Sequence, residues 1–240
     1  MSYELSIVLC TIDERTGLRS LTGKLENILN IPFQIVFIDD GSTDGSREFI
    51  QDFSASHSNS KYIFNSSKQS LLIADYSGIK NSDGKYIVLM DADLQHPVDK
   101  VNDIYEKLKQ GYDIVVASRY MSGGSTGNRK AVRGLISRVA GAIAHIIVKN
   151  SRGTSDPLSG FYGFRSGLRM DIDQRWRGYK TLLFLLASNP GTRITEIPYV
   201  FRERDKGDSK IVDGMDFILT YLIELFLVKR VEVKVRKSFH

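Results

Sequence analysis

The chain has a single cysteine, Cys10, among its 240 residues. One thiol excludes a disulfide framework, and no cysteine and histidine cluster has the spacing of a zinc site, so a reducing, cytoplasmic compartment is expected. No run of about 18 or more uncharged apolar residues occurs, and no secretory signal opens the chain, so neither a spanning helix nor export is expected. Repeats and low-complexity tracts are also missing. With 42% hydrophobic residues, the chain can bury the core of one large domain.

Two common nucleotide-binding signatures are missing as well. No Gly-x-Gly-x-x-Gly follows a predicted strand, and no Gly-x-x-x-x-Gly-Lys-Ser/Thr occurs. A Rossmann oxidoreductase and a P-loop enzyme are therefore disfavoured. Positive charge is in excess, at a formal net +5. That excess favours an anionic partner, such as a nucleotide, a lipid phosphate, a membrane surface or a nucleic acid.

Strand and helix patterns alternate along the chain. Strands are predicted over 4–11, 34–40, 61–65, 86–91, 113–118 and 194–200, and helices over 15–30, 46–56, 70–81, 98–110, 128–149 and 215–228. Ser42 or Thr43 is the natural cap of the second helix. Alternation with short connections predicts a parallel α/β sheet.

Asp91 and Asp93 follow a short apolar run, which is typical of a buried strand. In an extended chain, residues two apart point to the same side, so both carboxylates can face one ion beyond the strand's carboxyl end. Hard oxygen donors suit Mg²⁺ or Mn²⁺, held together with substrate phosphates. Capping and turn formation are the alternative roles. A second Asp-x-Asp, at Asp171 and Asp173, has no strand leading into it and is predicted to be solvated surface.

Asp39 and Asp40 end the second predicted strand at the same edge of the sheet. Acidic residues in this place accept hydrogen bonds from a ribose or a base in nucleotide-binding sheets. Helix capping and loop solvation are the alternative for Asp40.

Seven motifs resemble those of a known family in their order and spacing. They are Thr11…Glu14, Ile38–Ser42, Met90–Pro97, Ala117–Tyr120, Asp156–Phe161, Gly178–Lys180 and Arg202–Lys210. Over about residues 5–225 the chain resembles a family 2 glycosyltransferase, most closely the dolichyl-phosphate mannose synthases and related polyprenyl-phosphate sugar transferases. The resemblance implies a GT-A (Rossmann-like) α/β/α sandwich with a mostly parallel central sheet. Its catalytic domain would span 1–212, followed over 213–240 by an amphipathic helix and a basic tail, with no transmembrane domain.

The resemblance also implies roles for individual residues. Asp91, Asp93 and Gln95 would hold Mg²⁺ or Mn²⁺. The nucleotide sugar would contact Thr11, Glu14, Asp39, Asp40, Asp91, Ala92, Asp93 and Lys210. Arg119, Arg133, Ser137 and Arg204 would receive a lipid phosphate, and the catalytic set would be Asp91, Asp93, Arg119 and Arg204. The chain departs from the family pattern at Ser70-Leu71-Leu72, where Gly-Leu-Gly is usual, and at Phe184, where a Glu is usual.

The choice of acceptor follows from the charges. A phosphate monoester acceptor is already ionised at neutral pH and needs no general base, whereas a sugar hydroxyl needs one. A phosphate acceptor does need cations, because two anions must be brought together. The candidates for these cations are Arg119, Arg133, Arg204 and Lys210. The charges therefore favour a lipid phosphate acceptor, and the resemblance implies an inverting transfer to polyprenyl (dolichyl) phosphate, with mannose from GDP-mannose favoured. A UDP-glucose donor, a saccharide acceptor and a non-enzymatic nucleotide- or nucleic-acid-binding module are the alternatives. Nucleic acid is not the expected partner, because aromatic and basic residues do not interleave.

Two segments have the pattern of interfacial helices. Residues 129–149 combine apolar residues at helical spacing with a basic first half, and the apolar segment 215–228 is followed by a basic tail. Such helices can lie on the anionic, cytoplasmic face of a membrane and make the protein peripheral. Helices packed on the core, the second followed by a strand over 231–235, are the alternative. The loop over 201–210 is expected to order over the donor, with Arg204 closing on phosphate.

Overall fold

The computed structural model describes residues 3–66, 68–127, 131–202 and 215–238. Its strands are β1 (Leu5–Thr11), β2 (Phe33–Asp39), β3 (Ser60–Phe64), β4 (Tyr86–Asp91), β5 (Ile114–Ser118), β6 (Tyr162–Arg165) and β7 (Ile194–Pro198). Its α-helices are α1 (Arg15–Ile28), α2 (Ser46–Ser56), α3 (Leu71–Lys80), α4 (Lys100–Lys109), α5 (Ala131–Ile147), α6 (Thr181–Ser188) and α7 (Met215–Lys237), with a 3₁₀ turn, η1 (Lys149–Gly153), after α5.

The described strands form one sheet in the order β3-β2-β1-β4-β6-β5-β7. All neighbouring pairs are parallel except those of β6, which runs antiparallel to both β4 and β5. The predicted mostly parallel sheet is therefore confirmed. The predicted strands correspond to six of these elements, and β6 is an addition, because a run of four residues is too short to stand out from its surroundings.

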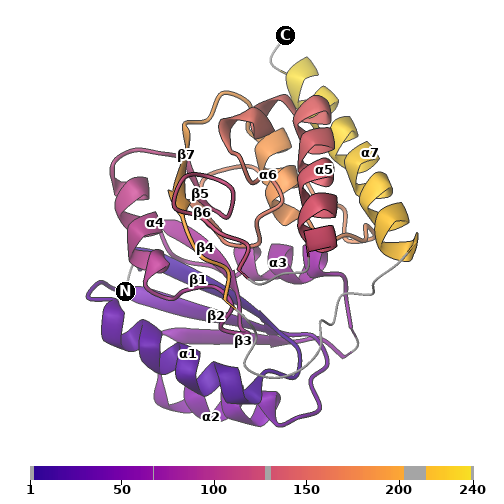
Figure 1. Cartoon of the computed structure of the whole chain (residues 1–240). Helices are drawn as coiled ribbons and strands as arrows, with labels where there is room; N and C mark the ends of the chain where they lie inside the picture. Colours follow the sequence, from indigo (N-terminus) through magenta and orange to yellow (C-terminus); the bar gives the residue numbers. More distant parts are fainter. Residues whose placement is uncertain (1–2, 67, 128–130, 203–214, 239–240) are drawn as a thin grey trace.

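Helices cover both faces of the sheet, as an α/β/α sandwich requires (Figure 1). The apolar residues of α1, α2 and α4 join one core cluster with one face of the strands. Those of α3, α5, α6 and α7 join a second cluster with the other face. Strand β1 shows how this works: Leu5, Ile7 and Leu9 point into the first cluster and Val8 into the second. A strand buried on both sides reads as a continuous apolar run, which is why these strands were visible in the sequence.

The strand register brings the acidic residues to one edge of the sheet. Thr11 at the end of β1 pairs with Asp39 at the end of β2. On its other side β1 places Cys10 opposite Asp91, the last residue of β4. Because parallel strands end together, residues some 50 positions apart in the sequence surround one site, as expected.

One local prediction and one alternative are wrong. Neither Ser42 nor Thr43 caps α2: its N-cap is Gly45, in a left-handed conformation with φ 90°, and the Asp44 carboxylate accepts from the backbone N–H of Ser46 instead. The alternative of a strand over 231–235 fails as well, because α7 runs without a break to Lys237. Val231 and Val235 are buried at helical spacing in the second core cluster, which favours the helix.

Candidate active site

The two aspartates proposed as metal ligands stand at the end of β4 and in the turn that follows. The side chain of Asp91 is 43% exposed, and that of Asp93 is half-buried. Asp93 Oδ1 accepts a hydrogen bond from the Gln95 backbone N–H at 3.1 Å. Leu94, which follows Asp93, has φ 62°, and this left-handed conformation turns the chain sharply after the strand. Both carboxylates are thus accessible from the carboxyl edge of the sheet.

Gln95 connects this turn to the described segment that ends at residue 202. Its Nε2 donates to the Arg202 carbonyl at 3.1 Å, and the Arg202 backbone N–H donates to the Gln95 carbonyl at 3.1 Å. The predicted phosphate ligands Arg204 and Lys210, and the predicted closing loop from residue 203 onward, lie outside the described residues. The attachment of Arg202 nevertheless shows that this segment leaves the sheet directly beside the aspartate turn.

His96 is hydrogen-bonded to the backbone of Asp91. The Asp91 backbone N–H donates to His96 Nδ1 at 3.0 Å, so the proton of a neutral imidazole lies on Nε2, which is 3.7 Å from Asp91 Oδ2. The ring is 2% exposed and stacks on Phe161 at a centroid distance of 4.9 Å. His96 belongs to a motif recognised in the sequence, but no role was assigned to it, because only the fold shows that the ring turns back onto the strand.

Asp39 is buried at the end of β2. Its Oδ1 accepts from the backbone N–H groups of Gly41 and Ser42 and from Arg47 Nε, at 3.1, 3.1 and 2.6 Å. Its Oδ2 is buried with no hydrogen-bond partner in the described chain. A carboxylate with one oxygen held by the protein and the other unpaired is positioned to accept from a ligand hydroxyl or N–H. This geometry fits the predicted nucleotide contact.

The other predicted nucleotide residues have different surroundings. Both Asp40 oxygens have partners in the chain, Asn65 Nδ2 at 2.7 Å and the Gln69 backbone N–H at 2.9 Å, so Asp40 fixes the loop after β3. The Glu14 backbone N–H donates to Ser46 Oγ at 3.0 Å, which joins the loop after β1 to the start of α2. Thr11 and Ala92 are buried beside the site, and the Thr11 hydroxyl has no partner in the part of the chain that the structure describes.

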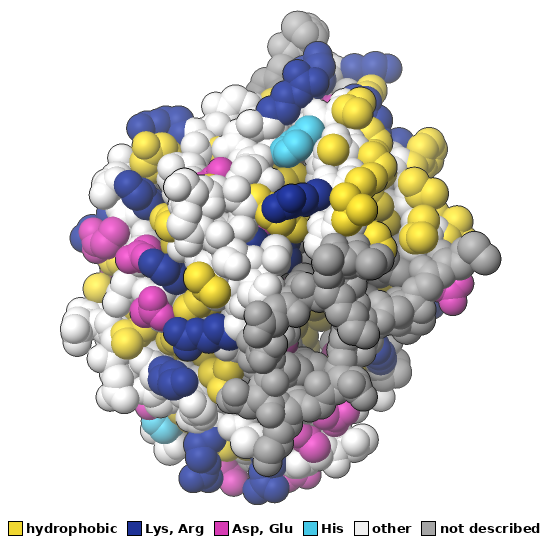
Figure 2. Space-filling model, viewed as in Figure 1, with side chains coloured by type: hydrophobic (Ala, Val, Ile, Leu, Met, Phe, Trp, Pro, Cys, Tyr) yellow, Lys and Arg dark blue, Asp and Glu magenta, His cyan; other side chains and the backbone are white. Residues whose placement is uncertain are grey.

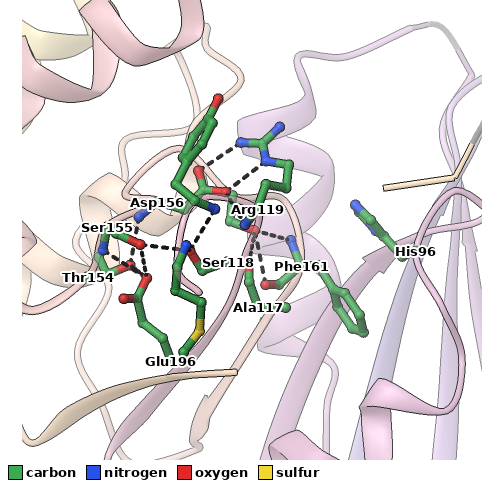
Figure 3. A network of polar contacts seen from close by, with 12 residues as sticks. His96, Ala117, Ser118, Arg119, Thr154, Ser155, Asp156, Phe161 and Glu196 are labelled. Carbon is green, nitrogen blue, oxygen red and sulfur yellow. Dashed lines mark hydrogen bonds and ion pairs between the residues drawn. The ribbon is translucent and has the colours of Figure 1, made fainter. Parts of the chain in front are cut away.

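Arg119 lies at the end of β5 and is bound on two sides by Asp156 (Figure 3). Its Nε and Nη2 donate to the two Asp156 carboxylate oxygens, each at 2.7 Å, and its backbone N–H donates to Oδ2 at 3.1 Å. The arginine is 8% exposed and the aspartate fully buried. The carboxylate raises the pKa of Arg119 against the opposing effect of burial. Such a fork-to-fork pair fixes the plane of the guanidinium and leaves Nη1 for another anion.

The segment that carries Asp156 also reaches Asp91. Ser155 and Thr154 donate to Glu196 on β7, and Ser159 Oγ donates to the Ala117 carbonyl at 2.8 Å, so the segment is anchored at both ends (Figure 3). A Cβ on Gly160 would stand only 3.8 Å from Asp91 Oδ2. One anchored segment therefore passes close to the carboxylate at the end of β4 and holds the guanidinium at the end of β5.

Ser137, predicted to bind a lipid phosphate, lines a hollow of about 270 Å³ between α5 and the 155–158 segment. Tyr120, Arg138, His145 and Asp156 also line it. The guanidinium groups of Arg119 and Arg138 lie 5.4 and 5.5 Å from the Tyr120 ring centroid. Arg133 lies in α5, on the turn before Ser137; its side chain is outside the described set. The hollow is thus bordered by the Arg138 cation and, through Asp156, adjoins the Arg119–Asp156 pair.

Residues near α6 complete the site, and no role for them had been derived from the sequence. Asp75 on α3 accepts from Cys10 Sγ at 3.0 Å and from Thr181 Oγ1, and burial raises its pKa to about 7. Glu224 on α7 accepts from the backbone N–H groups of Tyr179 and Lys180. Their contacts join residues more than 40 positions apart, so no local pattern in the sequence signals them.

The donor set fits a hard divalent cation. Asp91 and Asp93 provide carboxylates and Gln95 an amide at one turn, with no sulfur ligand among them. No group of three or more acidic, histidine or cysteine side chains suited to a metal occurs in the described ranges. Mg²⁺ is commonly held by one or two carboxylates with the remaining positions filled by substrate phosphates and water. The residues therefore fit an ion that binds together with a diphosphate.

Comparison with known proteins assigns the family. The family model described as "Glycosyl transferase family 2" matches residues 6–177, which run from the second residue of β1 to beyond the end of β6. The chain belongs to glycosyl transferase family 2. The match confirms the resemblance inferred from the seven motifs.

Relatives of this family 2 chain include two proteins named dolichol-phosphate mannosyltransferase. The one from Pyrococcus furiosus is 32% identical over 209 residues, which cover 87% of this chain and 59% of the relative. The one from Saccharomyces cerevisiae is 30% identical over 238 residues, 94% of this chain and 86% of the relative. The chain thus spans less than two thirds of the Pyrococcus protein and most of the yeast protein.

Solved structures confirm the GT-A fold of the family 2 chain. Glucosyl-3-phosphoglycerate synthase from Mycobacterium tuberculosis, crystallised with Mn²⁺, UDP and glucosyl-3-phosphoglycerate, matches 98% of this chain and 79% of its own at a TM-score of 0.59 and 15% identity. A mannosyltransferase from Pyrobaculum calidifontis in complex with GDP-Man and Mn²⁺ matches 85% of this chain and 57% of its own. Its TM-score is 0.56 and its sequence identity is 13%. At these identities the likeness concerns the fold.

Proposed function

We propose that this chain transfers a sugar, with mannose from GDP-mannose favoured, to a polyprenyl (dolichyl) phosphate with inversion at the anomeric carbon. The names of the two relatives support this choice of substrates. The observation that carries the proposal is the 156–160 segment, which holds Arg119 through Asp156 and passes close to Asp91 at Gly160. A cation for an acceptor phosphate and an acid for a donor's metal ion thus meet at one place.

The chemistry follows from the charges. An acceptor phosphate oxygen attacks the anomeric carbon, the bond from that carbon to the diphosphate breaks, and the nucleoside diphosphate leaves with the electron pair. Asp91, Asp93 and Gln95 would hold a Mg²⁺ or Mn²⁺ ion, which when bound supplies charge neutralisation for the leaving diphosphate. Arg119 brings the acceptor anion up to the donor, and its pairing with Asp156 fixes its orientation before substrate arrives. Asp39 Oδ2 accepts from the nucleoside.

The acceptor phosphate is proposed to enter through the hollow beside α5. Ser137 and Arg138 lie on the helix side and Tyr120 and Asp156 on the opposite side. The Tyr120 hydroxyl is buried with no partner in the described chain, so it can donate to an incoming phosphate oxygen. Arg133, Arg204 and Lys210 remain proposed phosphate ligands.

Peripheral binding to an anionic membrane is part of the proposal. No described helix is long and apolar enough to cross a bilayer. Every large hydrophobic side chain that stands exposed in the described chain, apart from Tyr62 and Val200, lies on α5 or α7. They form a stripe with Lys and Arg side chains at its upper end in Figure 2. An apolar strip beside cations is typical of a helix lying in a lipid interface.

The apolar stripe predicts a specific loss of membrane binding. Phe226 on α7 is 63% exposed, and burying such a side chain is worth about 1.5–3 kcal/mol. Phe226→Glu should therefore weaken binding to phosphatidylserine-containing vesicles by roughly tenfold or more in co-sedimentation. The matched control is Tyr62→Glu, at another exposed aromatic residue, on the edge strand β3. Equal binding by the two variants would contradict a docking role for α7.

One assay tests the proposed reaction. Radiolabelled GDP-mannose or UDP-glucose is incubated with dolichyl phosphate in detergent, with Mg²⁺, Mn²⁺ or EDTA. We expect transfer of mannose to the lipid, and its loss in EDTA, because two carboxylates alone leave the diphosphate charge unneutralised. Preference for UDP-glucose would favour the alternative donor. Undiminished turnover after chelation would exclude the proposed role of Asp91 and Asp93.

Two further parts of the proposal concern the domain boundaries of the chain and its location in the cell. The catalytic domain is proposed to span 1–212, with 213–240 as an appended helix and basic tail. The protein is proposed to work at the cytoplasmic face of the membrane, and nucleic acid is not among its proposed partners.

A further inference from the structure

A buried carboxylate of α7 fixes the backbone at the start of α6. Glu224 is fully buried, and its Oε1 accepts from the N–H groups of Tyr179 and Lys180 at 2.6 and 2.9 Å. The fit is tight, because a Cβ on Gly178 would lie 2.0 Å from the same oxygen. The Gly178 carbonyl in turn accepts from the Leu72 N–H at 3.0 Å. The Gly178–Lys180 segment is therefore held in one position by two other helices.

The next residue connects this segment to the metal-binding strand. Thr181 Oγ1 donates to Asp75, and Asp75 accepts from Cys10 Sγ at 3.0 Å. Cys10 is the strand partner of Asp91. Lys180 is the N-cap of α6 and is followed by Thr181, which is linked by two hydrogen bonds to Cys10, the strand partner of the proposed metal ligand.

The ammonium group of Lys180 lies within electrostatic range of charges from several elements of the site. Asp91, Asp156, Glu224 and Arg119 all act on it electrostatically, and burial lowers its pKa. It makes no hydrogen bond or ion pair with any residue of the described chain. Lys180 is half-buried, so its ammonium group is open to a ligand, and an anionic ligand would supply the counter-charge that the described chain does not. The reaction brings two such anions, a donor diphosphate and an acceptor phosphate.

We propose that Lys180 binds a substrate phosphate in this site, and that Glu224 is the positioning residue that holds it there. The inference rests on the proposed function for its choice of phosphate-bearing substrates. It also assigns a consequence to α7: Leu222, Ile223 and Phe226, exposed on the proposed membrane face, lie within one turn of Glu224. The helix that meets the lipid surface is thereby the one that positions the lysine.

The test compares Lys180→Met, which keeps the length of the side chain and removes its charge, with Lys109→Met. Lys109 is an exposed lysine in the last turn of α4, paired with Glu106. Binding of inorganic phosphate and of GDP with Mn²⁺ is measured by calorimetry, and transfer to dolichyl phosphate by the assay above. Lys180→Met should lower kcat/KM by about 100-fold and weaken phosphate or GDP binding, while Lys109→Met changes neither.

Thermal unfolding separates this role from a structural one. Because Lys180 has no partner in the described chain, Lys180→Met should leave the unfolding midpoint unchanged or raise it. A loss confined to GDP affinity identifies the donor diphosphate as the partner; a loss confined to phosphate binding and to the KM of the lipid identifies the acceptor. Unchanged affinities for both probes, or a midpoint that falls along with activity, would overturn the proposal. The binding measurements need no turnover, so they stand even if no transfer to lipid phosphate is found.

The role of Glu224 has its own comparison. Glu224→Gln retains an oxygen that can accept from the backbone N–H groups of Tyr179 and Lys180, so it should preserve most of the transfer activity. Glu224→Leu should lose about as much transfer activity as Lys180→Met. The double variant Glu224→Leu/Lys180→Met should be no worse than Lys180→Met alone, because both changes act through one ammonium group. Additive losses would show that Glu224 acts independently of Lys180, contrary to the proposal.

Discussion

Asp93→Ala should lower sugar transfer by about 1,000-fold, since a bound metal ion supplies several kcal/mol of charge stabilisation at the leaving group. Asp93 is half-buried, and among the described contacts its carboxylate accepts from the backbone N–H of Gln95. The fold should therefore tolerate the change, and circular dichroism and the unfolding midpoint should stay close to those of the unchanged protein. Transfer at saturating Mn²⁺ is the measurement.

The chain carries a matched control for this experiment in its second Asp-x-Asp. As predicted, that pair lies at the surface: Asp171 pairs with Lys234 and Asp173 with Arg175. Asp173→Ala should leave transfer unchanged, because no described contact joins Asp173 to the residues at the carboxyl edge of the sheet. If the two alanine variants lost activity equally, or if Asp93→Ala retained it, the carboxylates at the end of β4 would not be the metal ligands.

Asp156→Ala should reduce the free energy of unfolding by about 3–5 kcal/mol, because it leaves the Arg119 guanidinium buried without its counter-ion. The pair is bidentate and almost completely shielded from water, so water cannot replace the lost carboxylate. Urea denaturation followed by tryptophan fluorescence measures the change, since the single Trp176 packs against Phe184 in the core.

A double replacement separates stability from function at the same place. Arg119→Met/Asp156→Leu removes both charges and should recover most of the lost stability. It should still fail to transfer sugar, because the cation proposed to receive the acceptor phosphate is absent. Recovery of activity together with stability would show that the pair serves the fold alone.

Much of this molecule could be predicted from the sequence. The strands of the central sheet are buried on both faces and therefore appear as continuous apolar runs, and the acids that end β2 and β4 mark the edge of the site. The motif order implied the family, which the family model confirms. Local patterns were less reliable at helix ends: the cap of α2 depends on Gly45 and Asp44 in a particular turn, and Ser42, chosen from its residue type, instead accepts from the Asp13 N–H.

The contacts that complete the site were decided only by the tertiary structure. Asp156 meets Arg119 across 37 positions and Glu224 meets Lys180 across 44. Antiparallel β6, from later in the chain, enters between β4 and β5, which are consecutive strands in the sequence. Hydrophobic periodicity reports which face of an element is buried, and it does so one element at a time. Which buried charge faces which depends on how the elements pack, and the cost of burying an unpaired charge selects among packings only once the whole chain has folded.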